Sequence, residues 1–136
     1  MRRLRVEKAE KKVTSAKVTE YEPDLSWNLW KVPPKGKDPG VPLEPEKRVK
    51  VEITWPDLET YELLIGHEST FASFHALTRR CATKISNFEV SGSAIATGAE
   101  LVAVRVGRVN KVRELSLNIG SFIFKESLLD EEEEKN

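Results

Sequence analysis

The residue types most often used as zinc ligands and as catalytic bases or nucleophiles are scarce in this chain: two histidines and one cysteine. The spacings of zinc sites are absent. His75 lies beside the apolar face of a predicted helix and Cys81 lies on it, which favours a packing role for the histidine and a buried, inert thiol. No nucleophile has an obvious base, and neither a Walker loop nor a dinucleotide-binding fingerprint is present. We expect no enzyme activity, no metal and no cofactor.

A short run of small residues, Ser91, Gly92 and Ser93, follows a predicted strand and precedes a predicted helix. At a helix start, small residues leave backbone amides open to a phosphate, and the helix dipole assists binding. The alternative is structural, because Gly92 also permits a tight turn and a serine can cap the helix. Both interpretations place this turn at the N-terminus of a helix.

Seven cationic side chains follow the two predicted helices, and they are the remaining candidates for a site. They would form a phosphate-binding surface if they converged, but ordinary solubilising charge explains them almost as well. Residues 51–125 carry eight basic and eight acidic side chains, so they have no positive surplus. The candidates are Arg79, Arg80, Lys84, Arg105, Arg108, Lys111 and Arg113.

Two strands and a helix are predicted to position these groups in the first part of the folded segment. Strict alternation in Arg48–Trp55 predicts a strand with one buried face. Tyr61–Ile65 is predicted to be a second strand. A helix capped by Ser69 or Thr70 follows, because apolar residues then recur at spacings of three and four. Its apolar face consists of Phe71, Phe74, Leu77 and Cys81.

The second part is predicted to add a short strand, a helix and another strand. The short strand is Phe88–Val90, and the helix runs from Ala94 to Val106 with apolar residues nearly all round, which predicts burial. Alternation in Leu115–Ile119 predicts a half-buried strand, broken by Gly120. The order strand, strand, helix, strand, helix, strand predicts a mixed α/β fold.

Charge is unevenly distributed although the net charge is zero. Residues 1–50 carry 13 Lys and Arg against 8 Asp and Glu, whereas residues 126–136 carry one lysine against six acids. All seven prolines lie between Pro23 and Pro56. We interpret residues 1–46 as a charged, proline-rich arm with a docking segment at Trp27–Trp30, and residues 126–136 as an acidic tail. Such a charge split points to nucleic-acid or partner binding.

The chain has no apolar run near the roughly 20 residues that span a bilayer. Its basic N-terminus is not followed by a hydrophobic signal region. One cysteine cannot form an intrachain disulfide, so an oxidising compartment is not implied. We expect a soluble protein without membrane partners, cytoplasmic or, in a eukaryote, nuclear.

Three stretches between Leu64 and Ser121, about two-fifths of the chain, form one pattern. Phe88–Ile95 contains a strand, a small-residue turn and a Gly-x-Ala-Ile sequence, Phe71–Leu77 is helical, and Val112–Ser121 ends in Ile-Gly-Ser. Together they resemble the Alba superfamily of small DNA- and RNA-binding proteins. In that resemblance Phe88–Ile95 matches the family's strand, turn and helix start, Phe71–Leu77 matches its first helix, and Val112–Ser121 matches the strand that ends in Ile/Val-Gly-Ser/Thr.

The chain departs from the Alba pattern in its basic residues. The family commonly has lysines where His67 and Glu68 stand, and often a basic residue at the position of Ser93. The family's long basic hairpin and last strand are not recognisable after Ser121. Placing Arg48–Trp55 in the missing sheet position, as in a permuted topology, would complete the sheet. These losses weaken the expectation of nucleic-acid binding more than that of the fold.

We therefore expect residues 47–125 to form an Alba-like two-layer α/β sandwich, with a mixed four- to five-stranded sheet and two helices. The resemblance implies binding of RNA or DNA phosphates by the seven cations and by the amides of Ser91–Ser93, in a chromatin or ribonucleoprotein component. It also implies a homo- or heterodimer, or a subunit of a larger particle. The alternative is a protein-interaction subunit that keeps the fold without binding nucleic acid, and works through Trp27–Trp30 and the acidic tail.

Overall fold

A four-stranded antiparallel sheet forms the centre of the protein, with strand order β1-β2-β5-β6. The computed structural model describes residues 13–15, 18–104 and 110–135, without the side chains of 13–15 and 129–135. The strands of the sheet are β1 (Val13–Ser15), β2 (Val18–Tyr21), β5 (Lys50–Thr54) and β6 (Ala82–Ser86). The expected combination of helices and strands is confirmed, but this sheet is antiparallel throughout and not mixed.

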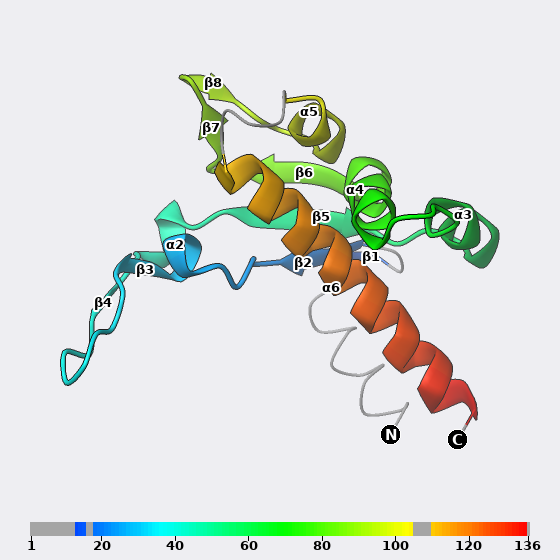
Figure 1. Ribbon diagram of the computed structural model, residues 1–136, viewed down its shortest axis with the longest axis horizontal. Coiled ribbons are helices and arrows are strands. Elements are labelled where there is room, and N and C mark those ends of the chain that lie inside the picture. Colours follow the sequence, from blue (N-terminus) through cyan, green and yellow to red (C-terminus); the bar gives the residue numbers. More distant parts are fainter. Residues whose placement is uncertain (1–12, 16–17, 105–109, 136) are drawn as a thin grey trace.

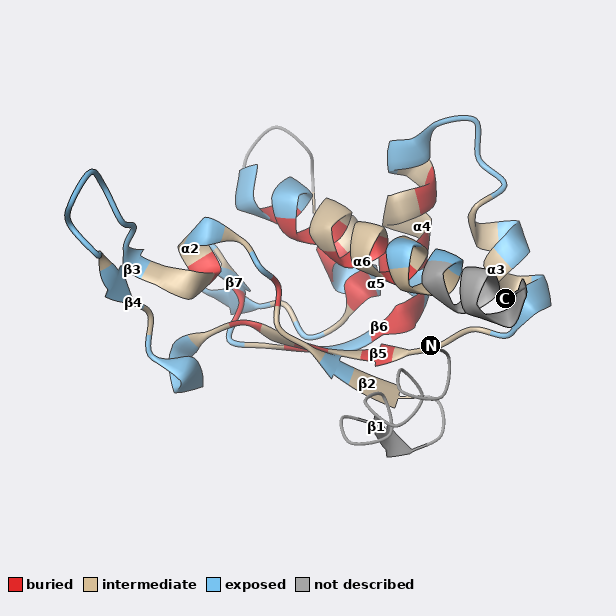
Figure 2. Cartoon of the chain, turned by 90° about the horizontal axis from the view of Figure 1, so that it is seen from below, coloured by how far each residue is buried: buried red, intermediate tan, exposed pale blue. Residues whose placement is uncertain are grey.

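Three helices lie on one side of this sheet (Figures 1 and 2). They are α4 (Thr70–Cys81), α5 (Gly98–Val102) and α6 (Asn110–Lys135). Smaller elements surround this two-layer core, and with them the described residues contain five α-helices where two were expected. The smaller elements are α2 (Ser26–Leu29), β3 (Trp30–Val32), β4 (Val41–Pro42), the 3₁₀ turn η1 (Pro45–Lys47), α3 (Leu58–Leu64), β7 (Glu89–Val90) and β8 (Ser93–Ala94).

β5 has the one-sided burial that its alternating sequence predicts. Val51 and Ile53 are fully buried under the helices, and Lys50, Glu52 and Thr54, which alternate with them, point to the other face of the sheet. On that face Glu52 is paired in register with Lys84 of β6, and their side-chain charges lie 3.8 Å apart. The two faces of the sheet therefore differ: one is the apolar core, and the other is polar.

α4 begins where the sequence predicts, because the Ser69 hydroxyl accepts a hydrogen bond from the amide of Ala72. Two glycines let neighbouring helices approach its backbone closely. A Cβ atom at Gly98 of α5 would overlap the carbonyl oxygen of Thr78, and one at Gly120 of α6 would overlap that of Phe74. The sequence predicted that Gly120 breaks a strand, but the residue lies inside α6. It is where α6 approaches the backbone of α4.

The predicted strand at Tyr61–Ile65 is wrong, because these residues belong to α3 and its C-terminal end. Asp57 caps this helix by accepting a hydrogen bond from the amide of Thr60 at 2.8 Å. Its apolar residues are incompletely buried: Leu58 and Leu63 are 66% and 74% exposed. A short apolar run is compatible with either a helix or a strand, and here the Asp57 cap at its start favours the helix.

The predicted helix Ala94–Val106 is also wrong over most of its length. β7 and β8 form an antiparallel hairpin that pairs Val90 with Ser93, and Ala94 is exposed in its second strand. The helix here is only α5, which starts in a capping box between Thr97 and Glu100. Residues 105 and 106 lie outside the described residues.

The predicted strand Leu115–Ile119 is helical and lies inside α6. The buried positions of this helix recur at spacings of three and four, so they form one stripe facing the core. The backbone of residues 126–135, expected to form a separate acidic tail, continues the same helix. The stripe consists of Val112, Leu115, Ser116, Ile119, Gly120 and Ile123.

The domain begins well before residue 47, so the expected boundary excludes parts of the core. β2 pairs with β5 along its whole length, and the ring of Tyr21 stacks on Phe122 with centroids 3.9 Å apart. Asn28, 1% exposed, donates to the carbonyl of Pro23 and accepts from the amide of Val49 at 2.7 Å. The sequence did not predict β2, because proline and charged residues dominate residues 1–46 and a strand of four residues leaves little pattern among them.

Candidate functional site

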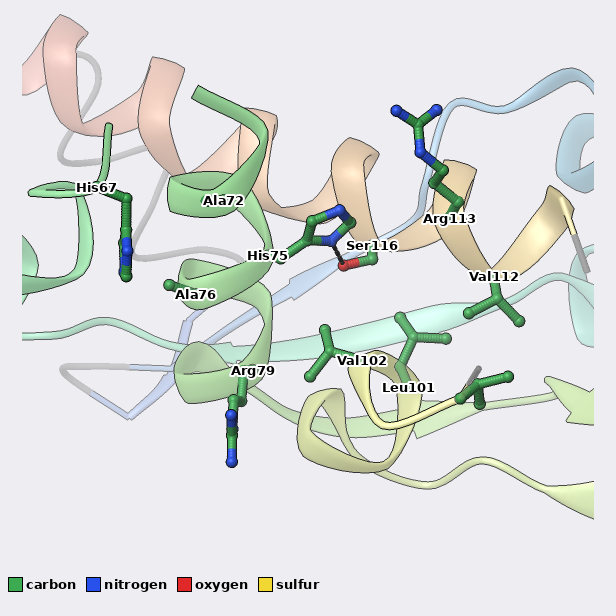
Figure 3. A pocket seen from close by; sticks show the side chains of 11 residues that line it. His67, Ala72, His75, Ala76, Arg79, Leu101, Val102, Val112, Arg113 and Ser116 are labelled. Carbon is green, nitrogen blue, oxygen red and sulfur yellow. Dashed lines mark hydrogen bonds between the residues drawn. The ribbon is translucent and has the colours of Figure 1, made fainter. Parts of the chain in front are cut away.

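A cavity of about 480 Å³ opens between α4, α5 and the first turns of α6 (Figure 3). Its polar lining consists of His67, His75, Arg79, Arg113 and Ser116. Its apolar lining consists of Ala72, Ala76, Leu101, Val102, Val104 and Val112. None of these eleven residues is acidic, so the lining has an excess of positive charge and aliphatic walls.

Helix geometry explains how α4 contributes four residues to one wall. Ala72, His75, Ala76 and Arg79 are spaced by three, one and three, and so lie along one side of the helix next to its buried stripe. Their small alanines leave the space that bulkier residues would fill. Opposite them, Leu101 is fully buried and forms part of the floor. The cavity is therefore a gap between helices that the sequence leaves unfilled.

His75 and Ser116 connect the two long helices at the middle of the cavity, where Nδ1 lies 2.6 Å from the serine Oγ. Burial and the neighbouring Arg113 guanidinium both lower the pKa of His75 below its ordinary value, so the imidazole is neutral at pH 7. Ser116 is held in turn by Thr78, whose hydroxyl donates to its carbonyl oxygen at 2.6 Å. The pair fixes the spacing of α4 and α6.

A serine beside a neutral histidine also resembles the start of a catalytic dyad. Such a dyad needs a third group that orients the histidine and amides that stabilise an oxyanion. Among the described residues, no side chain or carbonyl accepts a hydrogen bond from the other imidazole nitrogen. The amides near Ser116 lie inside a continuous helix and are used by it. We assign the pair a structural role.

Of the five candidate cations that the structure describes, two line the cavity. Arg79 and Arg113 come from α4 and α6, and Figure 3 shows them on either side of the His75 imidazole. Arg80, the neighbour of Arg79, is exposed on α4 outside the lining. Arg105 and Arg108 lie outside the described residues.

Lys84 and Lys111 lie away from this cavity. Lys84 belongs to β6 and not to the end of the helix, and its partner Glu52 holds it on the far face of the sheet. The Lys111 ammonium lies over the ring of Trp27, 5.2 Å from its centroid. The described part of the chain therefore has no single surface that contains all the predicted cations.

Ser91, Gly92 and Ser93 do not form a phosphate cradle at a helix start, because no helix begins there. Ser91 and Gly92 are the two turn residues of the β7–β8 hairpin, with φ of 52° and 82°. Positive φ at both positions is typical of a type I′ turn, where glycine is favoured. The glycine was thus correctly linked to a tight turn, but the element after it was predicted incorrectly.

Trp27 and Cys81 both lie inside the fold. The Trp27 ring packs against Phe88, with centroids 5.9 Å apart, so the Trp27–Trp30 segment docks on this domain. Cys81 is 1% exposed, and burial raises the pKa of its thiol to about 11. A thiol that is neutral and inaccessible has little reactivity.

Sequence reasoning missed most of the cavity lining. One part of it could have been predicted, because the first helix was predicted correctly and helical spacing places four of the lining residues on one side of it. These are Ala72, His75, Ala76 and Arg79. Ser116 and Val112 could not be placed beside His75 while their segment was interpreted as a strand. The pairing of α4 with α6 is a tertiary contact, and no local pattern predicts it.

Comparisons with known proteins found no match: no family model, no curated protein and no solved structure resembles this chain closely enough to be assigned. Within the described ranges, no helix has the length and apolar character needed to cross a membrane. In the same ranges, no three His, Cys, Asp or Glu side chains gather as metal ligands would.

Proposed function

We propose that this protein binds RNA or DNA through phosphates at the helical face of the domain. One observation supports this proposal: Arg79 and Arg113, 34 positions apart in the sequence, line the same cavity, and none of the eleven described residues that line it is acidic. Arginine suits this role because its planar guanidinium donates two parallel hydrogen bonds to a phosphate. Arg80 adds an exposed cation on the same helix.

The proposed binding surface is smaller than the one expected from the sequence. It consists of Arg79, Arg80 and Arg113, while Lys84 and Lys111 are engaged elsewhere and the hairpin turn Ser91–Ser93 is not part of it. Few phosphate contacts give weak, sequence-independent and strongly salt-dependent binding. A cytoplasmic or nuclear location and a place in a ribonucleoprotein or chromatin particle belong to the same proposal.

An Alba-like ancestry is a further part of the proposal, and it has one structural support. α4 occupies the stretch Phe71–Leu77, which resembles the family's first helix. Phe88–Ile95 forms a hairpin and Val112–Ser121 forms a helix, where the family pattern predicts a helix start and a strand. The proposed function therefore depends on side-chain positions and not on ancestry.

Fluorescence anisotropy of labelled single-stranded and duplex oligonucleotides at several salt concentrations tests this function. The logarithm of the affinity should fall linearly with the logarithm of the salt concentration. Replacing Arg79 and Arg113 together by alanine should weaken binding to all sequences and reduce the slope by up to about 1.4–1.8, which is about 0.7–0.9 per contact.

Lys84→Ala is the matched control, because it removes one cation from the opposite face of the sheet. It should leave both affinity and slope unchanged. Absence of wild-type binding at low salt, or an equal effect of Lys84→Ala, would contradict the proposed surface.

A second candidate function is protein interaction, and the exposed apolar residues of α3 and α4 support it. Leu58, Leu63 and Phe71 are 66%, 74% and 52% exposed. Large apolar side chains exposed on two neighbouring helices are candidates for an interface. Light scattering on wild type and on Leu58→Ser/Leu63→Ser tests for a dimer through this surface. A wild-type dimer that becomes a monomer in the variant would support it, and a monomer in both would contradict self-association here.

A further inference from the structure

We infer that the cavity between α4, α5 and α6 is also a small-molecule site, and that it takes an amphipathic anion. The apolar body of this ligand would lie against Ala76, Leu101 and Val102, and its anionic head would bind Arg79. A medium-chain carboxylate with an aliphatic tail, such as octanoate, has this chemistry. This inference goes beyond the binding of nucleic acid, because it concerns a small ligand that lies in the open cavity between the helices.

The size and the walls of the cavity specify the body of the ligand. Its volume of about 480 Å³ lies within the range of roughly 300–1,000 Å³ typical of small-molecule sites. The walls contributed by α5 are aliphatic, and Leu101 at the floor is fully buried. Water against such walls has few hydrogen-bond partners, so replacing it with an apolar group is favourable. The lining contains no Phe, Tyr or Trp on which a planar base could stack, which favours an aliphatic body.

The charges around the cavity specify the head of the ligand. Arg79 is exposed, lines the cavity and has no ion-pair partner among the described residues. Arg113 lies over the Phe71 ring, 5.2 Å from its centroid, and adds a second positive charge on the other side of His75. His75 is neutral and none of the described lining residues is acidic, so an anion would be attracted and a cation repelled. Arg79 is the free donor and therefore the expected contact.

Two ligands that differ only in their head group test this inference directly. Octanoate and octan-1-ol have the same apolar tail, and each can be tested for displacement of the fluorescent anion 1-anilinonaphthalene-8-sulfonate from the full chain. Octanoate should displace the probe at a concentration about tenfold lower than octan-1-ol, which reflects one charge-assisted hydrogen bond. Arg79→Gln should remove this preference, whereas Arg80→Gln, which changes the adjacent cation outside the lining, should keep it.

Filling the cavity tests the location. Ala76→Trp should weaken octanoate binding at least tenfold, with circular dichroism melts to establish that the variant is folded, and Val102→Phe provides a second filling variant if the first does not fold. Unchanged octanoate binding in a folded filling variant would overturn the inference, as would equal displacement by both ligands in the wild type. The assay contains no nucleic acid, so failure of the proposed function and failure of this site give different results.

Discussion

Glycine at position 120 is the residue on which the contact between α4 and α6 depends most directly. A Cβ there would overlap the backbone of Phe74, which cannot move like the end of a flexible side chain. Gly120→Ala should therefore destabilise the protein by at least about 1–3 kcal/mol, although alanine is a better helix former. Urea unfolding measures this change.

Gly66→Ala is the matched control for that experiment. A Cβ at Gly66 meets its nearest atom at 3.4 Å, which is ordinary contact, and its φ is not in the left-handed region. The urea midpoint of the Gly66→Ala protein should lie close to that of the wild type. Equal midpoints for Gly120→Ala and the wild type would show that the helices can separate at little cost.

His75 makes stability depend on pH in a defined direction. Burial and Arg113 lower its pKa in the folded protein, while the unfolded chain keeps a pKa of about 6.5. Above that pH both states are neutral and nothing changes. As the pH falls through 6.5 the unfolded state takes up the proton first, so the free energy of unfolding decreases until the folded pKa is passed.

His75→Asn should remove this dependence, because asparagine can still hydrogen-bond the Ser116 hydroxyl but does not titrate. Urea midpoints near pH 7.5 and near pH 5.5 should differ more in the wild type than in the variant. The same loss of stability in both proteins would assign the acid sensitivity to other groups.

At the scale of single residues, the sequence was most informative where a local rule acts alone. The cap at Ser69 and the buried thiol at Cys81 were predicted correctly, because capping and helical periodicity depend only on neighbouring residues. The role of Ser91 was not, since the same small residues suit a hairpin turn and a helix start.

At the scale of elements, α6 shows how one sequence fits two periodicities. Leu115, Leu117 and Ile119 alternate as in a strand, but Leu115, Ile119 and Ile123 are also spaced by four as in a helix. A long segment without proline favours the helix even with Gly120 inside it, and burial of the residues spaced by four stabilises it. α3 was mistaken for a strand for a similar reason, since its apolar run is too short to show a period.

The structure predicts a large effect for one substitution in α6 and a small effect for one in β8. Ile119→Ala should cost about 2–5 kcal/mol, because the side chain is fully buried between the helices and the sheet. Ala94→Glu, which would unfold a buried helix, should change stability by no more than about 0.5 kcal/mol, because Ala94 is exposed in β8. Thermal or urea unfolding compares them. A large loss of stability in Ala94→Glu would contradict the exposed position of Ala94 and indicate that this segment is buried.

At the scale of the whole molecule, the region before residue 47 belongs to the folded domain. β2 adds a strand beside β5, Tyr21 stacks on α6, and Asn28 hydrogen-bonds the buried backbone of both Pro23 and Val49. Deleting residues 1–46 should therefore abolish cooperative unfolding, since it leaves one edge of β5 without its paired strand and removes the Tyr21 and Asn28 contacts. A calorimetric melt of the truncated protein measures this.

Deleting only residues 34–39 is the control for that truncation. This segment is the exposed end of the β3–β4 hairpin, and the backbone of Gly40 already lies close to Pro33. The shortened protein should keep a cooperative transition. A cooperative transition in the chain that lacks residues 1–46 would instead show that the folded domain starts near residue 47, as the sequence predicted.

The division of cations between the two faces of the sheet is the central claim about function, and a chemical-shift map tests it most directly. ¹⁵N-labelled protein is titrated at low salt with short oligouridylate and oligothymidylate. The largest amide shifts should fall on α4 around Arg79 and on the first turns of α6 around Arg113, with little change at Lys84 in β6. Largest shifts on β6 and the β7–β8 turn, or no shifts at all, would contradict it.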